Sequence, residues 1–210
     1  MLDHLSGGRF DFGTGRGSST TEQAGFGITD PDLTKEMFDE VMPEFRKMWG
    51  QDSYSFDGRF FSMPERNVLP KPYVKPHPPM WVAAGNPDTF EKAAKLGLGV
   101  ICFTGGNPEK MRPLVELYKE TIKDADPVGD YVNDNVAIST SFMCLEDGDA
   151  ARAWMTKSRN GRQQSLVFKY LDTFPKPPGI PEWPEEIPDP TLEQLAIGRQ
   201  KGASIVGTPA

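Results

Sequence analysis

One arginine stands among alternating glycines near the N-terminus, in the segment Gly13-Thr14-Gly15-Arg16-Gly17. The three glycines leave one side of this predicted strand end almost bare of side chains. A guanidinium beside exposed backbone is a suitable seat for a phosphate group. The arginine could equally form a salt bridge within a loop, with the glycines only allowing tight packing. This segment alone leaves both interpretations open.

A second polar segment, Gly85-Asn86-Pro87-Asp88-Thr89, follows an apolar run. Asn86 is a good N-cap and Pro87 suits the first position of a helix. The N–H groups of Asp88 and Thr89 would then point out of the helix start, where the helix dipole favours an anion. Ordinary capping also explains the motif, and the Asp88 carboxylate could itself occupy that field. An anion site and a plain helix start are therefore both open here.

The elements that must position these segments repeat along the chain as strand, glycine-bearing turn and helix. Predicted strands begin near Phe10, Met80, Val100 and Val136, and the last of them runs to Leu145. Apolar strands that alternate with amphipathic helices predict a parallel sheet with helices outside it. Both polar segments follow such a strand, which favours a shared phosphate site.

The remaining segments predict helices, a hairpin and a long irregular connection. Leu33 to Trp49 has apolar residues at helical spacing, and Pro43 is expected to kink or divide that helix. Tyr54 to Phe61 predicts a hairpin about an Asp-Gly turn. A further amphipathic helix is expected from Pro108. The stretch from Phe174 to Pro190 carries seven prolines and is expected to be an irregular excursion.

Charge and composition exclude several classes of protein. The 210 residues carry 23 Lys and Arg against 30 Asp and Glu, a formal charge of −7, which argues against nucleic acid or an anionic membrane as a partner. No apolar run reaches the roughly 20 residues that a membrane helix needs, and no signal peptide is recognisable. Cys102 and Cys144 are expected to be reduced core thiols of a cytoplasmic protein. His77 is expected to shape a loop, because no carboxylate or thiol stands near it in sequence.

Three stretches in a fixed order resemble the bacterial luciferase-like flavin monooxygenases. The first is LDHLSGGRF at residues 2–10, which runs into FGTGRG and resembles the fourth-strand signature of that family. The second lies at residues 70–84 and ends in PHPPMWVAA, and the third is IVGTP at residues 205–209. Together these stretches span nearly the whole chain.

The resemblance implies an α/β fold of the (β/α)₈ TIM-barrel type, with residues 1–210 as a single partial barrel domain. The four predicted strands would be the fourth to the seventh, so the first three and the last are expected to be absent. The family's acid/base histidine comes from those early strands, and neither His4 nor His77 matches it. No catalytic residue is therefore assigned, no metal is expected, and this truncated copy is expected to be inactive alone.

The resemblance also implies a seat for the cofactor. Arg16 matches the arginine that grips the flavin phosphate, and Thr89 matches the hydroxyl residue of the helix start after the fifth strand. Asn86 stands where a serine is common, and Gly85 replaces an acidic residue. Gly15 replaces the reactive cysteine of luciferase, which speaks against light emission. The implied cofactor-binding residues are Gly15, Arg16, Gly85, Asn86, Thr89, Phe103 and Thr104.

The activity implied is oxidation of a small organic substrate by reduced FMN and O₂, with a separate flavin reductase as the source of the reduced flavin. One alternative is an oxidoreductase of the same superfamily that uses the deazaflavin F420 as a hydride carrier. Another is a non-catalytic flavin-binding or structural remnant. Two unpaired sheet edges would favour a homo-oligomer.

Overall fold

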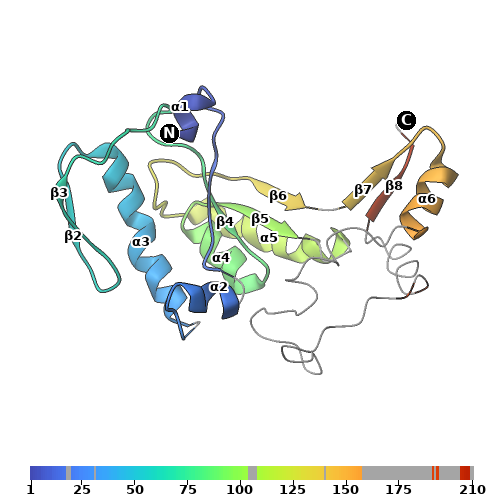
Figure 1. The fold of residues 1–210 in the computed structure, drawn as a ribbon, viewed down its shortest axis with the longest axis horizontal. Helices are drawn as coiled ribbons and strands as arrows, with labels where there is room; N and C mark the ends of the chain where they lie inside the picture. The colour runs from blue at the N-terminus through green and yellow to red at the C-terminus, as the bar shows by residue number, and fades with distance from the viewer. Residues whose placement is uncertain are drawn as a thin grey trace. The chain divides into compact units, whose positions relative to one another are not determined.

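The computed structural model describes residues 1–17, 20–30, 32–103, 108–139, 141–157, 191, 193 and 204–208. The chain divides into two compact units. The first comprises Met1–Arg16, Asp32–Cys102 and Arg112–Ile138, and the second comprises Gly17–Pro31, Phe103–Met111 and Ser139–Ala210. Figure 1 shows the elements under the labels used below. The predicted excursion from Phe174 to Pro190, and Thr104, lie outside the described residues.

The first unit is a parallel sheet with helices and a hairpin. Its elements are α1 (Leu2–Leu5), β1 (Phe12–Thr14), α3 (Leu33–Gly50), β2 (Tyr54–Asp57), β3 (Ser62–Arg66), β4 (Met80–Ala83), α4 (Pro87–Lys95), β5 (Gly99–Phe103), α5 (Arg112–Thr121), the short 3₁₀ helix η2 (Ile122–Asp124) and β6 (Val136–Ser139). The strands have the order β1-β4-β5-β6, and β4 pairs in parallel with both β1 and β5. The predicted parallel sheet is confirmed.

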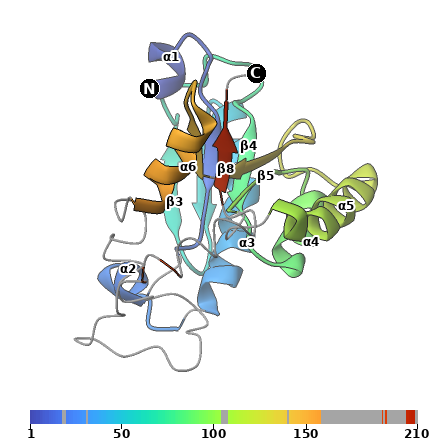
Figure 2. The same cartoon turned by 90° about the vertical axis from the view of Figure 1, so that its right-hand side faces the viewer.

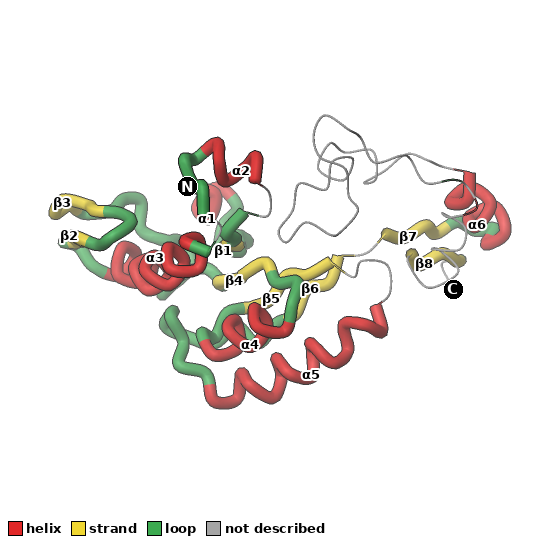
Figure 3. Tube along the Cα trace, turned by 90° about the horizontal axis from the view of Figure 1, so that it is seen from below, coloured by secondary structure: helices red, strands yellow, loops and turns green. Residues whose placement is uncertain are grey.

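One face of this sheet is packed and the other is more open. Met80 and Val82 of β4 and Val100 of β5 are buried, whereas Ile101, which points the opposite way, is 37% exposed. Figures 2 and 3 both show α4 and α5 side by side against the sheet. Alternate residues of a strand point to opposite faces, so the helices cover the face of Val82 and Val100. A sheet with helices on one face is the arrangement that a segment of a (β/α)₈ barrel presents.

Helix α3 begins at Leu33 and continues through Pro43 to Gly50, so the proline does not divide it. Its inward face packs Phe45 and Trp49 against Phe12 of β1, with ring centroids 4.8 and 5.1 Å from the Phe12 ring. The predicted amphipathic helix is confirmed, because the apolar residues at helical spacing meet the sheet. Their burial stabilises the helix more than the proline destabilises it.

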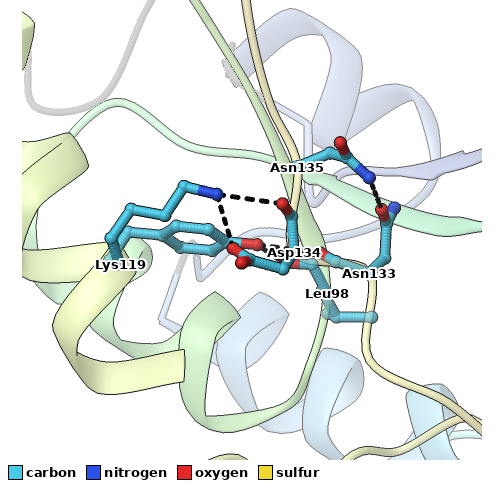
Figure 4. Close-up of polar contacts among 6 residues, drawn as sticks. Leu98, Lys119, Asn133, Asp134 and Asn135 are labelled. Atoms are coloured by element: carbon cyan, nitrogen blue, oxygen red, sulfur yellow. Dashed lines mark hydrogen bonds and ion pairs between the residues drawn. The ribbon is translucent and has the colours of Figure 1, made fainter. Parts of the chain in front are cut away.

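Polar contacts join α5 to the neighbouring strands. The Tyr118 hydroxyl, fully buried, donates to the carbonyl oxygens of Leu98 and Asn133, both at 2.9 Å. Lys119 donates to the backbone and side chain of Asp134, and Figure 4 shows the group together. Burial raises the pKa of Tyr118, with the nearby Asp134 charge acting in the same direction. The neutral phenol therefore links α5 to the segments that lead into β5 and β6.

The predicted hairpin is present, although its second strand begins later than the sequence indicated. β2 and β3 are antiparallel, with Asp57 paired to Ser62 across the connection 58–61. The Gly58 N–H donates to the carbonyl of Phe61 at 3.0 Å. A Cβ at Gly58 would lie 2.3 Å from the Phe56 ring and 2.5 Å from a Glu40 oxygen, so a side chain here would force those two side chains to shift. The Asp-Gly dipeptide therefore marks the turn correctly.

The second unit contains α2 (Thr20–Gly25), the short 3₁₀ helix η1 (Pro108–Met111), β7 (Ser141–Cys144), α6 (Gly148–Lys157) and β8 (Ser204–Gly207). The single strand predicted from Val136 to Leu145 is wrong, because β6 belongs to the four-stranded sheet and β7 pairs in parallel with β8. The apolar residues on both sides of Ser139-Thr140-Ser141 are typical of strands, and this pattern alone does not identify a change of strand partner. β8 is a strand that the sequence analysis did not predict.

The two cysteines differ in burial. Cys102 is fully buried, and burial raises the pKa of its thiol, whereas Cys144 is exposed at the end of β7. The expectation of two core thiols is therefore wrong for Cys144, whose strand has one partner in a two-stranded sheet. Both cysteines are free. None of the described helices combines the length and the apolar character needed to cross a bilayer.

Candidate functional site

The turn after β1 has the open backbone that the glycine pattern predicts. A Cβ at Gly15 would meet nothing within 4 Å, and Gly17 has a φ of +77°, a conformation that favours glycine. Thr14 ends the strand by donating its hydroxyl to the Trp81 carbonyl at 2.8 Å. Arg16 therefore leaves the sheet from a strand end fixed to β4.

Arg16 is half-buried and contacts the start of α3. Its Nη1 donates to Oγ1 of Thr34 at 3.0 Å. The pKa of Asp32, which precedes α3, is lowered first by a hydrogen bond and the charge of Lys35, and also by the Arg16 charge. Arg16 therefore contacts helix α3, whereas the alternative interpretation of the turn expected a salt bridge within a loop. That contact uses a neutral hydroxyl.

The start of α4 is capped as predicted. Asn86 has extended backbone, and its Oδ1 accepts from both the N–H and the hydroxyl of Thr89, each at 3.0 Å. Pro87 is the first helical residue. The expectation that the Thr89 N–H points freely out of the helix is wrong, because the Asn86 side chain accepts from it. An anion at this helix start would have to take these donors from Asn86.

The two predicted segments meet at one cavity. A cavity of about 200 Å³ lies where Arg16 approaches the first turn of α4, with Asp88 and Thr89 in its wall. Side chains of α3, β4 and α4 and the Leu98 side chain complete it. The lining residues are Arg16, Lys35, Phe38, Val82, Asp88, Thr89, Lys92, Ala93, Leu96 and Leu98. The structure thus brings a guanidinium and a helix start to one place.

Two further cations line this cavity, and sequence reasoning did not select them. Lys35 forms an ion pair with Asp32 at 2.8 Å, and Lys92 forms one with Asp39. Lys92 lies four residues after Asp88, and residues at this spacing share one side of a helix. This spacing could have predicted that Lys92 lies near the start of α4. With Arg16, the cavity wall carries three positive side chains against the single carboxylate of Asp88.

The other residues predicted to bind the cofactor are not in the wall of this cavity. Gly15, Gly85 and Asn86 are exposed, and they lie within two residues of the lining residues Arg16 and Asp88 in sequence. A Cβ at Gly85 would meet nothing within 4 Å, as at Gly15. Phe103 ends β5, but its side chain is outside the described part of the structure, as is all of Thr104. Their expected place beside the flavin ring stays a prediction.

His77 has the structural role expected from its sequence context. It is 1% exposed, and its ring stacks on Tyr131 with centroids 4.8 Å apart. The Asp130 N–H donates to Nε2 at 2.8 Å, so Nε2 carries no proton and Nδ1 donates to the Pro78 carbonyl. Within the described ranges, no three His, Cys, Asp or Glu side chains are grouped to hold a metal ion.

Comparison with known proteins defines the class. The luciferase-like monooxygenase family model matches residues 1–210, so the chain belongs to this family. Its parallel sheet and flanking helices are part of a (β/α)₈ barrel. The chain is similar over its full length to the monooxygenase RslO1 from Streptomyces bottropensis, with a TM-score of 0.64, 23% identity and 57% of that chain covered. It is similar over 99% of its length to the FMN complex of the oxygenating constituent of 3,6-diketocamphane monooxygenase from Pseudomonas putida, with a TM-score of 0.70, 17% identity and 60% of that chain covered.

Curated relatives include both flavin-dependent and F420-dependent enzymes. The chain is 33% identical over 102 residues to the oxygenase component of the flavin-dependent trigonelline monooxygenase of Acinetobacter baylyi, covering 48% of this chain and 28% of that protein. It is 26% identical over 181 residues to an F420-dependent glucose-6-phosphate dehydrogenase of Kineococcus radiotolerans, covering 81% and 51%. An uncharacterised protein of Sinorhizobium fredii is 29% identical over 185 residues, covering 86% and 52%. The chain spans about half the length of its relatives, or less.

Proposed function

We propose that this chain binds the phosphate of a flavin at the cavity between Arg16 and the start of α4, and that it belongs to an FMN-dependent monooxygenase. One observation carries this proposal: Arg16 and the first turn of α4, 72 residues later in the chain, line the same cavity. A guanidinium fork and a helix start are both groups that proteins use to hold phosphate.

The residues present fit a phosphate by their chemistry. Arg16, Lys35 and Lys92 line the cavity, and the two lysines pair with Asp32 and Asp39, which are not among its lining residues. Thr89 supplies an N–H and a hydroxyl, which the phosphate would take from the Asn86 side chain. A hydrogen bond from a charged donor contributes about 1.5–3 kcal/mol, so Arg16 alone would change affinity by about tenfold or more.

Bound FMN in its reduced form would supply the electrons that activate O₂ for oxidation of a small organic substrate. The part of this chain is to hold the phosphate end and so to orient the cofactor at the carboxyl ends of the strands. A separate flavin reductase would supply the reduced flavin, in the cytoplasm. Copies of the chain would pair at the sheet edges β1 and β6 to form a homo-oligomer.

The second candidate is an F420-dependent oxidoreductase, which the similarity to F420-dependent glucose-6-phosphate dehydrogenases supports. F420 also carries a phosphate, so the same cavity would hold it. The Gly-Thr-Gly-Arg-Gly segment resembles the FMN branch of the family, and for this reason we favour FMN. Titration of the 210-residue chain with each cofactor, followed by fluorescence, separates the two candidates.

The phosphate seat is tested by comparing FMN with riboflavin, which lacks the phosphate. The wild-type chain is expected to bind FMN at least tenfold more tightly than riboflavin. Arg16→Ala should raise the Kd for FMN at least tenfold and leave the Kd for riboflavin unchanged. Equal affinity for both flavins, or an unchanged Kd for FMN in Arg16→Ala, would remove Arg16 from the site.

A further inference from the structure

We infer that Lys92 is a phosphate-binding residue of this cavity, and that through it the site selects a doubly charged phosphate monoester over a singly charged phosphate. This inference rests on the proposed function and adds the charge state of the ligand. Lys92 lies in the second turn of α4 and lines the cavity together with Asp88 and Thr89. Lys92 lies three residues after Thr89, so the two share one side of the helix. A phosphate bound to Thr89 is therefore one helical turn from Lys92.

Two adjacent residues of α3 hold the Lys92 ammonium beside the cavity. Its Nζ forms an ion pair with the Asp39 carboxylate and lies 5.5 Å from the centre of the Phe38 ring. Phe38 lines the cavity, whereas Asp39 is not among its described lining residues. The partner of Lys92 therefore leaves the cavity itself open to a ligand.

The ion pair with Asp39 does not prevent Lys92 from binding a phosphate. The side chains of Lys92 and Asp39 are 40% and 55% exposed. Exposed ion pairs contribute little stability, because water screens their charges. An ammonium also has three N–H donors, so Nζ can donate to Asp39 and to a phosphate oxygen together. Phosphate binding by Lys92 therefore requires no strong contact to be lost.

The position of Lys92 relative to Asp88 favours a ligand with two negative charges. The attraction of an ammonium for a phosphate is proportional to the phosphate charge, so a dianion gains about twice as much from Lys92 as a monoanion does. Repulsion by the Asp88 carboxylate doubles in the same way. Lys92, four residues later on the same side of α4, offsets that repulsion. A wall without this ammonium would disfavour the dianion more than the monoanion.

The test compares two substitutions that break the same ion pair. Lys92→Gln removes the ammonium and should raise the Kd for FMN about five- to twentyfold. Asp39→Asn removes only the partner and should leave that Kd unchanged or lower it. Lys92→Arg keeps the charge and should stay within about threefold of wild type, and no variant should change the Kd for riboflavin. If Lys92 served only to join α4 to α3, Lys92→Gln and Asp39→Asn would change the Kd for FMN in the same direction, and the inference would be overturned.

Selection by charge is tested with FMN and its phosphate methyl ester, which has the same flavin and one negative charge. A phosphate monoester gains its second charge near pH 6. Wild type should bind FMN at least threefold more tightly at pH 8 than at pH 5, and in Lys92→Gln this gain should fall below about twofold. The Kd for the methyl ester should not change with pH, which controls for the charged groups around the site. These are the wall residues Arg16, Lys35, Asp88 and Lys92, with the lysine partners Asp32 and Asp39.

An equal gain with the methyl ester, or a full gain in Lys92→Gln, would overturn the selection of the dianion by Lys92. Failure of this inference also differs from failure of the proposed function. If FMN binds better than riboflavin and Arg16→Ala weakens it, but Lys92→Gln has the wild-type Kd, Lys92 does not bind the phosphate and the proposed function stands. If wild type binds FMN no better than riboflavin, both fail.

Discussion

Helix α3 presents two different kinds of charged surface on its two sides. On the side toward the β2–β3 hairpin, Glu36, Glu40 and Glu44 stand at intervals of four residues and so lie in a row. On the other side, Lys35 and Phe38 line the cavity that Arg16 and α4 share. Figure 1 shows the hairpin running beside the helix.

The carboxylates of the hairpin side all have partners within the chain. Glu36 pairs with Arg59, and Glu44 accepts from the Tyr54 hydroxyl at 2.9 Å. Glu40 accepts from the N–H groups of residues 59, 60 and 61. On the cavity side Lys35 and Lys92 also pair with carboxylates, those of Asp32 and Asp39, but they line a space that a small anion could enter. The regular row of three glutamates is therefore structural, because each carboxylate has a partner within the chain. A pattern of charged residues indicates function only when the partners of those residues are known.

Of the substitutions that distinguish the two sides of α3, Tyr54→Phe is expected to have the largest effect, a loss of folding stability. Tyr54 is 3% exposed and Glu44 is 4% exposed, so the lost hydroxyl leaves a buried carboxylate oxygen without this donor. The expected cost is about 1–3 kcal/mol of unfolding free energy. Thermal and urea unfolding measure it. The Kd for FMN should not change, and a Kd that rises with the loss of stability would show that the hairpin side serves the site.

Asp88→Asn, on the cavity side, is expected to have a smaller effect, on FMN affinity. Asp88 is the single carboxylate in the cavity wall, and its charge repels a phosphate there. Its removal should lower the Kd for FMN about three- to tenfold, by Coulomb's law at the dielectric of a protein surface. The same titration of Glu91→Gln is the matched control, since Glu91 lies on α4 and pairs with Lys95 outside the described wall. Equal tightening by both variants would assign the effect to net charge.

The sequence predicted the local parts of this site and missed the contacts between distant parts. The Asn86 cap, the Pro87 helix start and the open Gly15 turn follow from backbone preferences of a few adjacent residues. The contact between Arg16 and Thr34 depends on how α3 is rotated against β1. Helical periodicity predicts which α3 residues are apolar and inward, but it does not identify the strand end that meets a given turn of the helix.

The same limit explains the errors in the fold. The segment from Val136 to Leu145 consists of residues that strands accept, so its division into β6 and β7 depends on pairing with distant segments. The exposure of Cys144 is a consequence of that pairing. Composition and spacing are local properties, whereas strand partners are set by the whole domain.

The smallest expected effect is a change with pH in the stability that Glu40, on the hairpin side of α3, contributes. Desolvation acts to raise the pKa of Glu40, but the N–H donors of Phe60, Arg59 and Phe61 outweigh it and hold the pKa below its ordinary 4.5. A carboxylate whose pKa is lowered in the folded state adds stability above its unfolded pKa and loses that contribution as the pH falls. The difference in melting temperature between wild type and Glu40→Gln should therefore be largest near pH 7 and should shrink below about pH 4.5.

Glu120→Gln provides the control for that experiment, because Glu120 is 77% exposed and forms a surface pair with Lys123. Exposed pairs of this kind contribute about 0–1 kcal/mol, so its melting temperature should follow wild type at every pH. A Glu40→Gln curve parallel to wild type from pH 7 to pH 3 would show that the three N–H contacts do not stabilise the carboxylate. The row of glutamates on the hairpin side would then contribute no more to stability than an exposed surface pair does.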